Sequence, residues 1–334
     1  MSKTGLLLEA FEGRNQTVPV WFMRQAGRYL PEYQAIKKKY SLEEMFSTPE
    51  LAAEITCLPI EKLGVDAAIL FADILTLPKA MGCDVRFDSP EGPVITQTIQ
   101  QTQLHDLDDL PYIRKIIQLV RQQLPAHIPL IGFAGSPFTV LVYLLEQGSS
   151  LNCSRTIRYI FEEPEKYHHL MDLLTKNTIR YYQLQKKAGI QVFQLFDTWA
   201  GILRPSDYSH LVLPYVSKIF EAIDLPSIYY AKNCHHLLPL MDKTKADFLS
   251  VCHTVVLGHH TTIEKTKKGI QGNLFNGLLY ADQETLKKEI RDVLIGGQKH
   301  KKYIFNLSHG VLPDVSWEKL KFIADEVHAF PWKR

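Results

Sequence analysis

Eight short apolar runs, each followed by a longer polar or amphipathic segment, constrain the fold of this chain more than any other feature. The runs cover residues 18–23, 67–71, 129–133, 191–196, 227–231, 248–251, 269–272 and 303–307. Runs that are apolar almost throughout are typical of parallel strands buried on both faces, and the segments between them are typical of helices. Eight such units predict an α/β fold, a single (β/α)8 TIM-type barrel.

Amphipathic helices are predicted over residues 49–63, 164–188, 206–223 and 283–295. Residues 84–87 and 93–96 flank the turn-forming stretch Ser89-Pro90-Glu91-Gly92, which predicts a hairpin excursion after the second strand. The seventh run is weak, with Ile270 as its one strongly apolar residue, so the pattern alone leaves an open sheet as the alternative. No linker divides the chain, and we expect residues 1–334 to form one domain.

Charge and cysteine content exclude several classes of protein. A formal net charge of +2 gives no reason to expect a nucleic-acid or membrane-surface binder. The five cysteines are scattered and include no Cys-x-x-Cys pair, which favours free thiols in a reducing compartment. Three leucines near the N-terminus are too few for a signal peptide, and no stretch approaches the roughly 18 apolar residues of a membrane span. We therefore expect a cytoplasmic protein.

Polar and titratable residues follow most of the runs. In a parallel barrel the active site lies at the carboxyl ends of the strands, so these residues are the first candidates for a site. They are Arg24, Arg28, Asp73, Ser136, Asp197, Thr198, Lys232, Asn233, Cys234, His235, Cys252, His253 and His309.

Arg24 and Arg28 lie four residues apart, so a helical turn would project both guanidinium groups from one face. Paired guanidinium groups suit carboxylates, because each can donate to two oxygens. Gly27 removes side-chain bulk and would let a ligand approach the backbone. The alternative is a structural role, in which the arginines pair with Glu32 or with helix carbonyls.

Asp73 follows the second run and is the candidate anion of the site. It would face the arginine pair from apolar surroundings, where a carboxylate acts strongly. The alternative is a helix N-cap, which aspartate performs well. Tyr143 and His309 also have structural alternatives, a core role for the tyrosine and a surface role for the histidine. The glycines at 132 and 135 do not form a phosphate loop, because the segment lacks the required spacing and lysine.

The same segments resemble the uroporphyrinogen decarboxylase family. Residues 19–33, with Met-Arg-Gln-Ala-Gly-Arg at their centre, resemble its first signature, and residues 132–139 resemble its second. Shorter matches occur at residues 71–75, 196–201, 271–274 and 305–310, so the similarity extends from about residue 6 to about residue 328.

The resemblance implies a cytosolic homodimer that removes CO2 from the four acetate side chains of uroporphyrinogen III, giving coproporphyrinogen III in haem biosynthesis. It implies no metal and no organic cofactor. Asp73 would stabilise the cationic intermediate through the pyrrole N–H groups, and Arg24, or a water that it holds, would be the candidate proton donor. The implied substrate contacts are Arg24, Gln25, Ala26, Gly27, Arg28, Asp73, Tyr143, Thr198 and His309.

Several positions depart from the family pattern in the last third of the chain. They are Asn233 to His236, Val251 to His253, Phe275-Asn276 and Ser308. Two alternatives follow from them. One is a zinc-dependent methyltransferase of the same superfamily, since cysteine and histidine bind zinc. The other is a tetrapyrrole-binding protein without catalytic activity.

Overall fold

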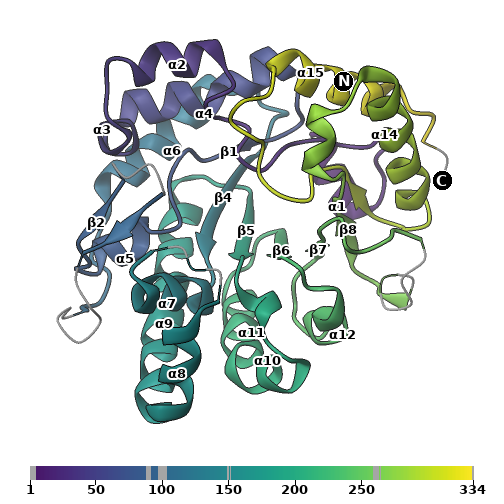
Figure 1. Cartoon of the computed structure of the whole chain (residues 1–334). Helices are drawn as coiled ribbons and strands as arrows, with labels where there is room; N and C mark the ends of the chain where they lie inside the picture. The colour runs from purple at the N-terminus through teal and green to yellow at the C-terminus, as the bar shows by residue number, and fades with distance from the viewer. Residues whose placement is uncertain are drawn as a thin grey trace.

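A parallel sheet forms the centre of the computed structural model, which describes residues 5–87, 92–96, 104–148, 150, 152–258, 263 and 265–332. Its seven strands are hydrogen-bonded in the order β1-β4-β5-β6-β7-β8-β9. They are β1 (Ala68–Ile69), β4 (Leu130–Gly135), β5 (Val192–Asp197), β6 (Ser227–Ala231), β7 (Phe248–Ser250), β8 (Gly269–Gln271) and β9 (Tyr303–Ile304). Each overlaps a predicted run, and Figure 1 shows the sheet surrounded by helices.

The first predicted run closes the sheet into a barrel, although it contributes only a single bridge. Val20 pairs in parallel with Phe305, just after β9. On its other side the Val20 carbonyl accepts the Asp66 N–H at 2.8 Å, just before β1. The run therefore lies between β9 and β1. The barrel of the sequence prediction is confirmed, with the first strand reduced to this bridge.

The helices alternate with the strands and cover the outside of the barrel (Figure 1). The α-helices are α1 (Leu6–Glu12), α2 (Pro31–Lys37), α3 (Leu42–Ser47), α4 (Pro49–Leu63), α5 (Thr76–Ala80), α6 (Pro111–Gln123), α7 (Pro137–Glu146), α8 (Ser154–Glu162), α9 (Pro164–Ala188), α10 (Pro205–Leu211), α11 (Leu213–Ala222), α12 (Leu238–Met241), α14 (Gln283–Gly297) and α15 (Trp317–Ala329). Short 3-10 helices are η1 (Ala200–Ile202), η2 (His235–Leu237) and η3 (Asn276–Tyr280).

One predicted helix is two helices. The segment predicted over 206–223 breaks at Val212, between α10 and α11, where φ is −125°. Pro214 lies in the first turn of α11, where its missing N–H needs no partner. The hairpin is confirmed as the antiparallel pair β2 (Val85–Arg86) and β3 (Val94–Ile95), while most of its turn, residues 88–91, lies outside the described residues.

A layer of polar side chains crosses the barrel interior. Gln271 donates to Gln194 Oε1 at 3.0 Å and to Ser250 Oγ at 2.9 Å, and it accepts from Trp21 Nε1 at 3.0 Å. All four side chains are fully buried, so these bonds replace the water that the polar groups lose on folding. The layer ties the first run to β5, β7 and β8 beneath the carboxyl ends of the strands.

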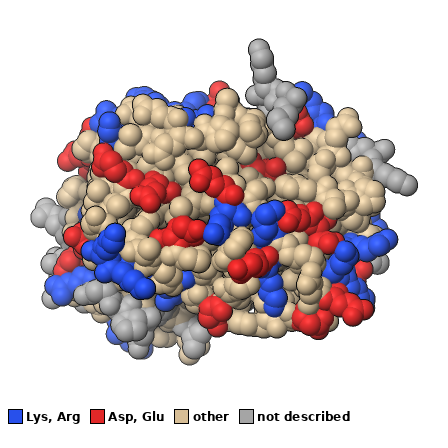
Figure 2. Space-filling view, turned by 90° about the horizontal axis from the view of Figure 1, so that it is seen from above, with Lys and Arg blue, Asp and Glu red and all other residues tan. Residues whose placement is uncertain are grey.

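The outer surface carries charges of both signs. Figure 2 shows acidic and basic side chains interspersed over one face, with no large field of one sign. Within the described part of the chain, no helix combines the length and apolarity needed to cross a bilayer.

Candidate active site

A cavity of about 340 Å³ opens at the carboxyl ends of the strands. Its lining includes eight of the nine residues for which the sequence predicts a substrate contact, all except Gln25. They are Arg24, Ala26, Gly27, Arg28, Asp73, Tyr143, Thr198 and His309. The fold thus brings together residues that are up to 285 positions apart, from Arg24 to His309.

Arg24 lies in a tight loop, not in the helical turn that the sequence suggested. Its φ of 60° is in the left-handed region, which is uncommon for a residue with a side chain. The adjacent backbone is held by the last strand of the barrel: Met23 N–H donates to Asn306 Oδ1 at 3.2 Å, and Met23 carbonyl accepts from Val311 N–H at 2.9 Å. Long-range bonds therefore fix the loop that presents both arginines.

The two guanidinium groups are unpaired within the described part of the chain. Neither Arg24 nor Arg28 has a side-chain hydrogen bond or ion pair there, and both residues are exposed at the cavity. Glu32, the candidate structural partner, instead pairs with Lys62 at 2.7 Å. The structural alternative with Glu32 is therefore wrong, and both cations remain available for anionic ligands.

Gly310 makes room for the Arg24 side chain. A Cβ at residue 310 would lie 2.5 Å from Arg24 Cδ and 2.8 Å from Cγ, closer than real Cβ contacts. We expect Gly310→Ala to displace the guanidinium and to lower kcat/KM by about tenfold or more, with the change in thermal midpoint small. Steady-state kinetics and thermal melting measure the two effects. Gly64→Ala is the control for kcat/KM: nothing lies within 4 Å of a Cβ there, but φ is 71° at this C-cap of α4, so we expect lower stability and an unchanged kcat/KM.

Gln25 supports the loop and does not line the cavity. Its side chain is fully buried, donates to Ala67 carbonyl at 2.9 Å and accepts from Phe22 N–H at 3.1 Å. Its carbonyl also accepts a hydrogen bond from Tyr29 OH. The structure thus gives Gln25 a structural place where the sequence suggested a substrate contact.

Asp73 lines the cavity and also closes the turn that leads into α5, whose N-cap is Leu75 and not Asp73 as the alternative predicted. Its Oδ1 accepts the Leu75 N–H at 2.8 Å, which caps the turn before α5. Its Oδ2 has no hydrogen-bond partner among the described residues. Burial raises the pKa of this carboxyl, while the Leu75 N–H and the charge of Arg24 act in the opposite direction. One oxygen thus fixes the residue and the other is left for a ligand.

Tyr143 and Thr198 are positioned by the buried carboxylate of Asp197, which the sequence predicted as a site candidate at the end of its strand without indicating its partners. Asp197 is fully buried and accepts hydrogen bonds from Ser136 Oγ at 2.5 Å, Thr139 Oγ1 at 3.0 Å and Tyr229 OH at 2.8 Å. Ser136 and Thr139 begin α7, which carries Tyr143 one turn later. Burial raises the pKa of Asp197, and the three hydroxyl donors oppose this shift.

Aromatic rings form a continuous wall of the cavity. Phe133, Phe196, Tyr230 and His309 follow one another with ring centroids 5.6, 5.7 and 6.4 Å apart. They come from β4, β5, β6 and the segment after β9. An aromatic residue near the end of each of these strands is the sequence signal for the wall, and the sequence prediction did not include it. The wall offers apolar ring faces against which a flat ligand could pack in the same cavity as the two arginines.

His309 is neutral at pH 7. Burial, with the positive charges of Arg24 and Lys232, lowers its pKa from 6.5 to about 4. Between pH 7 and pH 5 the unfolded chain therefore binds a proton that the folded chain does not, and the free energy of unfolding falls by about 2 kcal/mol. We expect His309→Gln to lose this part of the acid sensitivity, measured by urea denaturation at both pH values.

His328 is a matched control of opposite sign. Its hydrogen bond to Asp66, at 2.8 Å, raises its pKa above 6.5. Its stabilisation is therefore complete below pH 6.5 and is lost as the pH rises through the folded-state pKa. His328→Gln should cost more stability at pH 5 than at pH 7. Equal acid sensitivity of the wild type and His309→Gln would contradict a neutral, buried His309.

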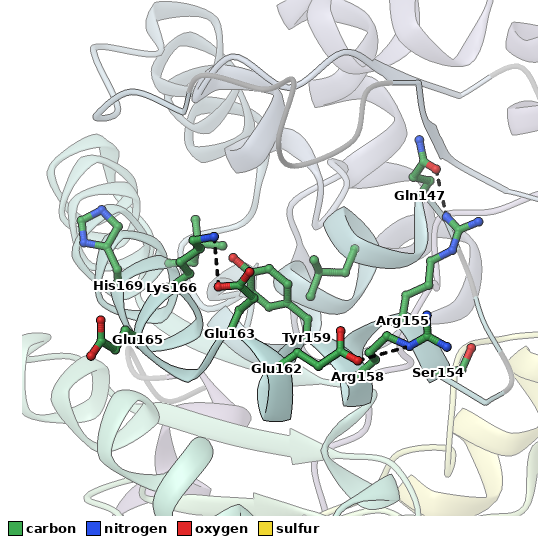
Figure 3. A pocket seen from close by; sticks show the side chains of 12 residues that line it. Gln147, Ser154, Arg155, Arg158, Tyr159, Glu162, Glu163, Glu165, Lys166 and His169 are labelled. Atoms are coloured by element: carbon green, nitrogen blue, oxygen red, sulfur yellow. Dashed lines mark hydrogen bonds and ion pairs between the residues drawn. The ribbon is translucent and has the colours of Figure 1, made fainter.

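A larger hollow, about 1100 Å³, lies on the outside of the barrel along α8 and the start of α9 (Figure 3). Its lysine and arginines are already engaged: Lys166 pairs with Glu163 at 3.0 Å, Arg158 with Glu162 at 4.0 Å, and Arg155 donates to Gln147 at 2.9 Å. It does not include the carboxyl ends of the strands. The smaller cavity, with its unpaired cations, is therefore the candidate active site.

The cysteines and histidines do not assemble a zinc site among the described residues, where no three of the side chains that bind metals come together. Cys234 is fully buried, and burial raises the pKa of its thiol. Cys252 Sγ accepts from Asn233 N–H at 3.3 Å. These contacts are those of structural thiols, so the arrangement does not favour the zinc alternative.

The fold and the position of the cavity place this chain among the α/β-barrel enzymes. A methyltransferase from Methanosarcina mazei shares the fold, with a TM-score of 0.82 and 19% identity over 97% of this chain and 98% of that one. A B12-independent methionine synthase from Shewanella sp. aligns with a TM-score of 0.62 and 10% identity over 86% and 88% of the two chains. At these identities the likeness concerns the fold alone.

Sequence comparison gives the family. The model of the family described as uroporphyrinogen decarboxylase (URO-D) matches residues 2–330. A protein named uroporphyrinogen decarboxylase from Thermodesulfovibrio yellowstonii is 42% identical over 97% of both chains. Another with this name, from Bacillus pumilus, is 40% identical over 98% of this chain and 95% of its own. The chain belongs to the uroporphyrinogen decarboxylase family.

Proposed function

We propose that this chain removes CO2 from the four acetate side chains of uroporphyrinogen III and gives coproporphyrinogen III, without a metal or organic cofactor. The observation that carries the proposal is one cavity that holds an unpaired carboxylate oxygen, two unpaired guanidinium groups and an aromatic wall. Family membership supports the same activity.

The substrate supplies its own electron sink. Protonation of a pyrrole ring carbon gives an iminium-like cation, the bond to the acetate carboxylate then breaks, and the released electron pair neutralises the ring as CO2 leaves. A proton added to the former acetate carbon completes a methyl group, and loss of the proton first added to the ring carbon restores the aromatic pyrrole. Asp73 Oδ2 faces this cation through the pyrrole N–H groups and stabilises the charge as it develops.

The remaining lining residues hold the substrate. Arg24 and Arg28 bind its carboxylates, each charge-assisted bond adding about 1.5–3 kcal/mol. Burial raises the pKa of Tyr143, helped by the charge of Asp73, so its hydroxyl stays protonated and donates. Neutral His309 and Thr198 provide further polar contacts. Arg24, or a water that it holds, is the candidate proton donor, and a group with so high a pKa acts more readily through water.

Anaerobic incubation with uroporphyrinogen III, with a chelator present, tests the activity. Products are oxidised and separated by their number of carboxylates. A series from eight carboxylates to four supports the proposal. Unchanged substrate from folded protein overturns it, and tight binding in that case identifies a tetrapyrrole-binding protein.

We further propose that residues 1–334 form one domain, that two copies associate, and that the protein works in the cytoplasm. All five cysteines lie in the described part of the chain, and none forms a disulfide, as expected in a reducing compartment. The association rests on family membership. Sedimentation equilibrium tests it, and the mass of a single chain at micromolar concentration contradicts it.

A further inference from the structure

Lys232 lies across the mouth of the barrel from the arginine loop. The ring of strands has eight places when the Val20 bridge is counted, and β6 is four places from that bridge in either direction. Lys232 directly follows β6, and Arg24 follows the Val20 bridge, so both leave the barrel at its carboxyl end. Since side chains alternate along a strand, Lys232 continues the side of Tyr230, whose ring lines the cavity.

The electrostatics of His309 agree with this placement. His309 lies in the cavity next to Tyr230, and the charges of both Arg24 and Lys232 lower its pKa. The two cations thus act on one imidazole from opposite sides of the barrel. Within the described part of the chain, the Lys232 ammonium has no hydrogen bond or ion pair, and the residue is exposed.

The backbone around Lys232 is fixed. The following residue, Asn233, has φ 53° and donates its N–H to Cys252 Sγ at 3.3 Å. Gly201 leaves room for the Lys232 carbonyl, which would lie 2.1 Å from a Cβ at residue 201. The backbone that bears the Lys232 side chain is therefore fixed before a ligand binds. Binding of an anion by the ammonium then costs less conformational entropy.

His253 provides a second polar group on the same rim. Its Nδ1 lies 3.3 Å from Ser308 Oγ, and its ring lies 4.4 Å from that of Phe275. Ser308 in turn donates to Asn276 Oδ1 at 3.1 Å. These four residues all depart from the family pattern, and they contact one another in a single cluster. The cluster is formed by His253 after β7, Phe275 and Asn276 after β8, and Ser308 after β9. Burial and the charge of Lys232 lower the pKa of His253. Because the Ser308 hydroxyl donates to Asn276, the neutral imidazole donates its one N–H to Ser308, which leaves Lys232 as the group on this rim that can bind an anion.

We propose that Lys232 binds a carboxylate on the edge of the substrate macrocycle opposite the edge that Arg24 and Arg28 hold. This inference rests on the proposed function, because it takes a flat ring with carboxylates around its whole rim as the ligand. Four carboxylates persist through the whole reaction, so this site is occupied in every decarboxylation step. Lys232 then acts on binding and orientation and not on the bond that breaks.

Kinetics of Lys232→Met and Lys232→Arg on uroporphyrinogen III test the assignment. We expect Lys232→Met to raise KM by about tenfold or more, with little change in kcat, and Lys232→Arg to restore most of the affinity. Lys187→Met is the matched control, since it removes another exposed lysine at the end of α9, which lies just before β5 and so at the amino end of the strands, away from the cavity. An unchanged KM in Lys232→Met, or no rescue by arginine, overturns the proposal.

Two readouts do not depend on turnover. Fluorescence titration with oxidised uroporphyrin should show weaker binding by Lys232→Met than by Lys187→Met, and equal binding overturns the proposal. NMR titration should show a higher pKa for His309 in Lys232→Met, because a positive charge is removed, and an unchanged pKa means that the ammonium does not face the cavity. If the wild type binds uroporphyrin but does not decarboxylate uroporphyrinogen, the proposed function fails while these readouts still decide the role of Lys232.

Discussion

Asp73→Asn is expected to lower kcat by about a hundredfold to a thousandfold while leaving substrate binding nearly intact. The amide keeps an oxygen that can accept the Leu75 N–H, so the cap of the turn before α5 is preserved. What is lost is the negative charge that faces the pyrrole cation. Single-turnover kinetics under anaerobic conditions, together with fluorescence titration of uroporphyrin, separates the chemical step from binding.

Asp66→Asn is the matched control for Asp73→Asn. Asp66 precedes β1 whereas Asp73 follows it, so the two carboxylates lie at opposite ends of the barrel. Asp66 accepts the Val20 N–H at 2.7 Å, and it does not line the cavity. We expect this variant to keep its kcat, with some loss of stability. Near-wild-type turnover in Asp73→Asn would contradict the proposal that the negative charge of Asp73 stabilises the pyrrole cation.

Asp197→Ala is expected to lower the free energy of unfolding by about 3–5 kcal/mol, the largest effect on stability that we predict. The substitution leaves Ser136, Thr139 and Tyr229 with buried hydroxyl groups that have lost their acceptor. It also opens space among side chains from β4, α7 and β6. Urea denaturation at pH 7 measures the loss.

Asp172→Ala is the surface counterpart of Asp197→Ala. Asp172 pairs with Lys218 at 2.8 Å, and both side chains are more than half exposed. Such a pair contributes about 0–1 kcal/mol. If both variants lose equally little stability, Asp197 is not the buried anchor of α7. If Asp197→Ala remains folded, we also expect a higher KM, since the Thr139 hydroxyl no longer fixes the turn before Tyr143.

The strands were predictable because burial on both faces leaves a plain signal in the sequence. Every predicted run from residue 67 onward overlaps an observed strand, including the weak run around Ile270, which β8 confirms. The first run was predicted as a full strand but pairs only at Val20. The break at Val212 was missed, although Pro214 is a local signal that could have indicated it.

The site was predicted less completely, because parts of it are set by distant residues. Arg24 takes a left-handed backbone beside a bond between Met23 and Asn306, which are 283 positions apart, and no local pattern shows this. The Asp197 network depends on partners from other elements in the same way. Gln25 lies within the family signature, yet its side-chain amide is hydrogen-bonded to backbone groups. A motif alone does not distinguish such a structural residue from one that contacts a ligand.

The bridge between Val20 and Phe305 has a consequence for synthesis of the protein on the ribosome. The loop with both arginines is synthesised well before the residues that clamp it, Asn306 and Val311, because Asn306 lies 283 positions after Met23. Until then the nascent chain has an open sheet with unpaired strand edges, which are prone to aggregation. We therefore expect the substrate to gain affinity only after residues 306 to 311 have been synthesised, and chaperones to be needed while the edge between β9 and the first run is still open.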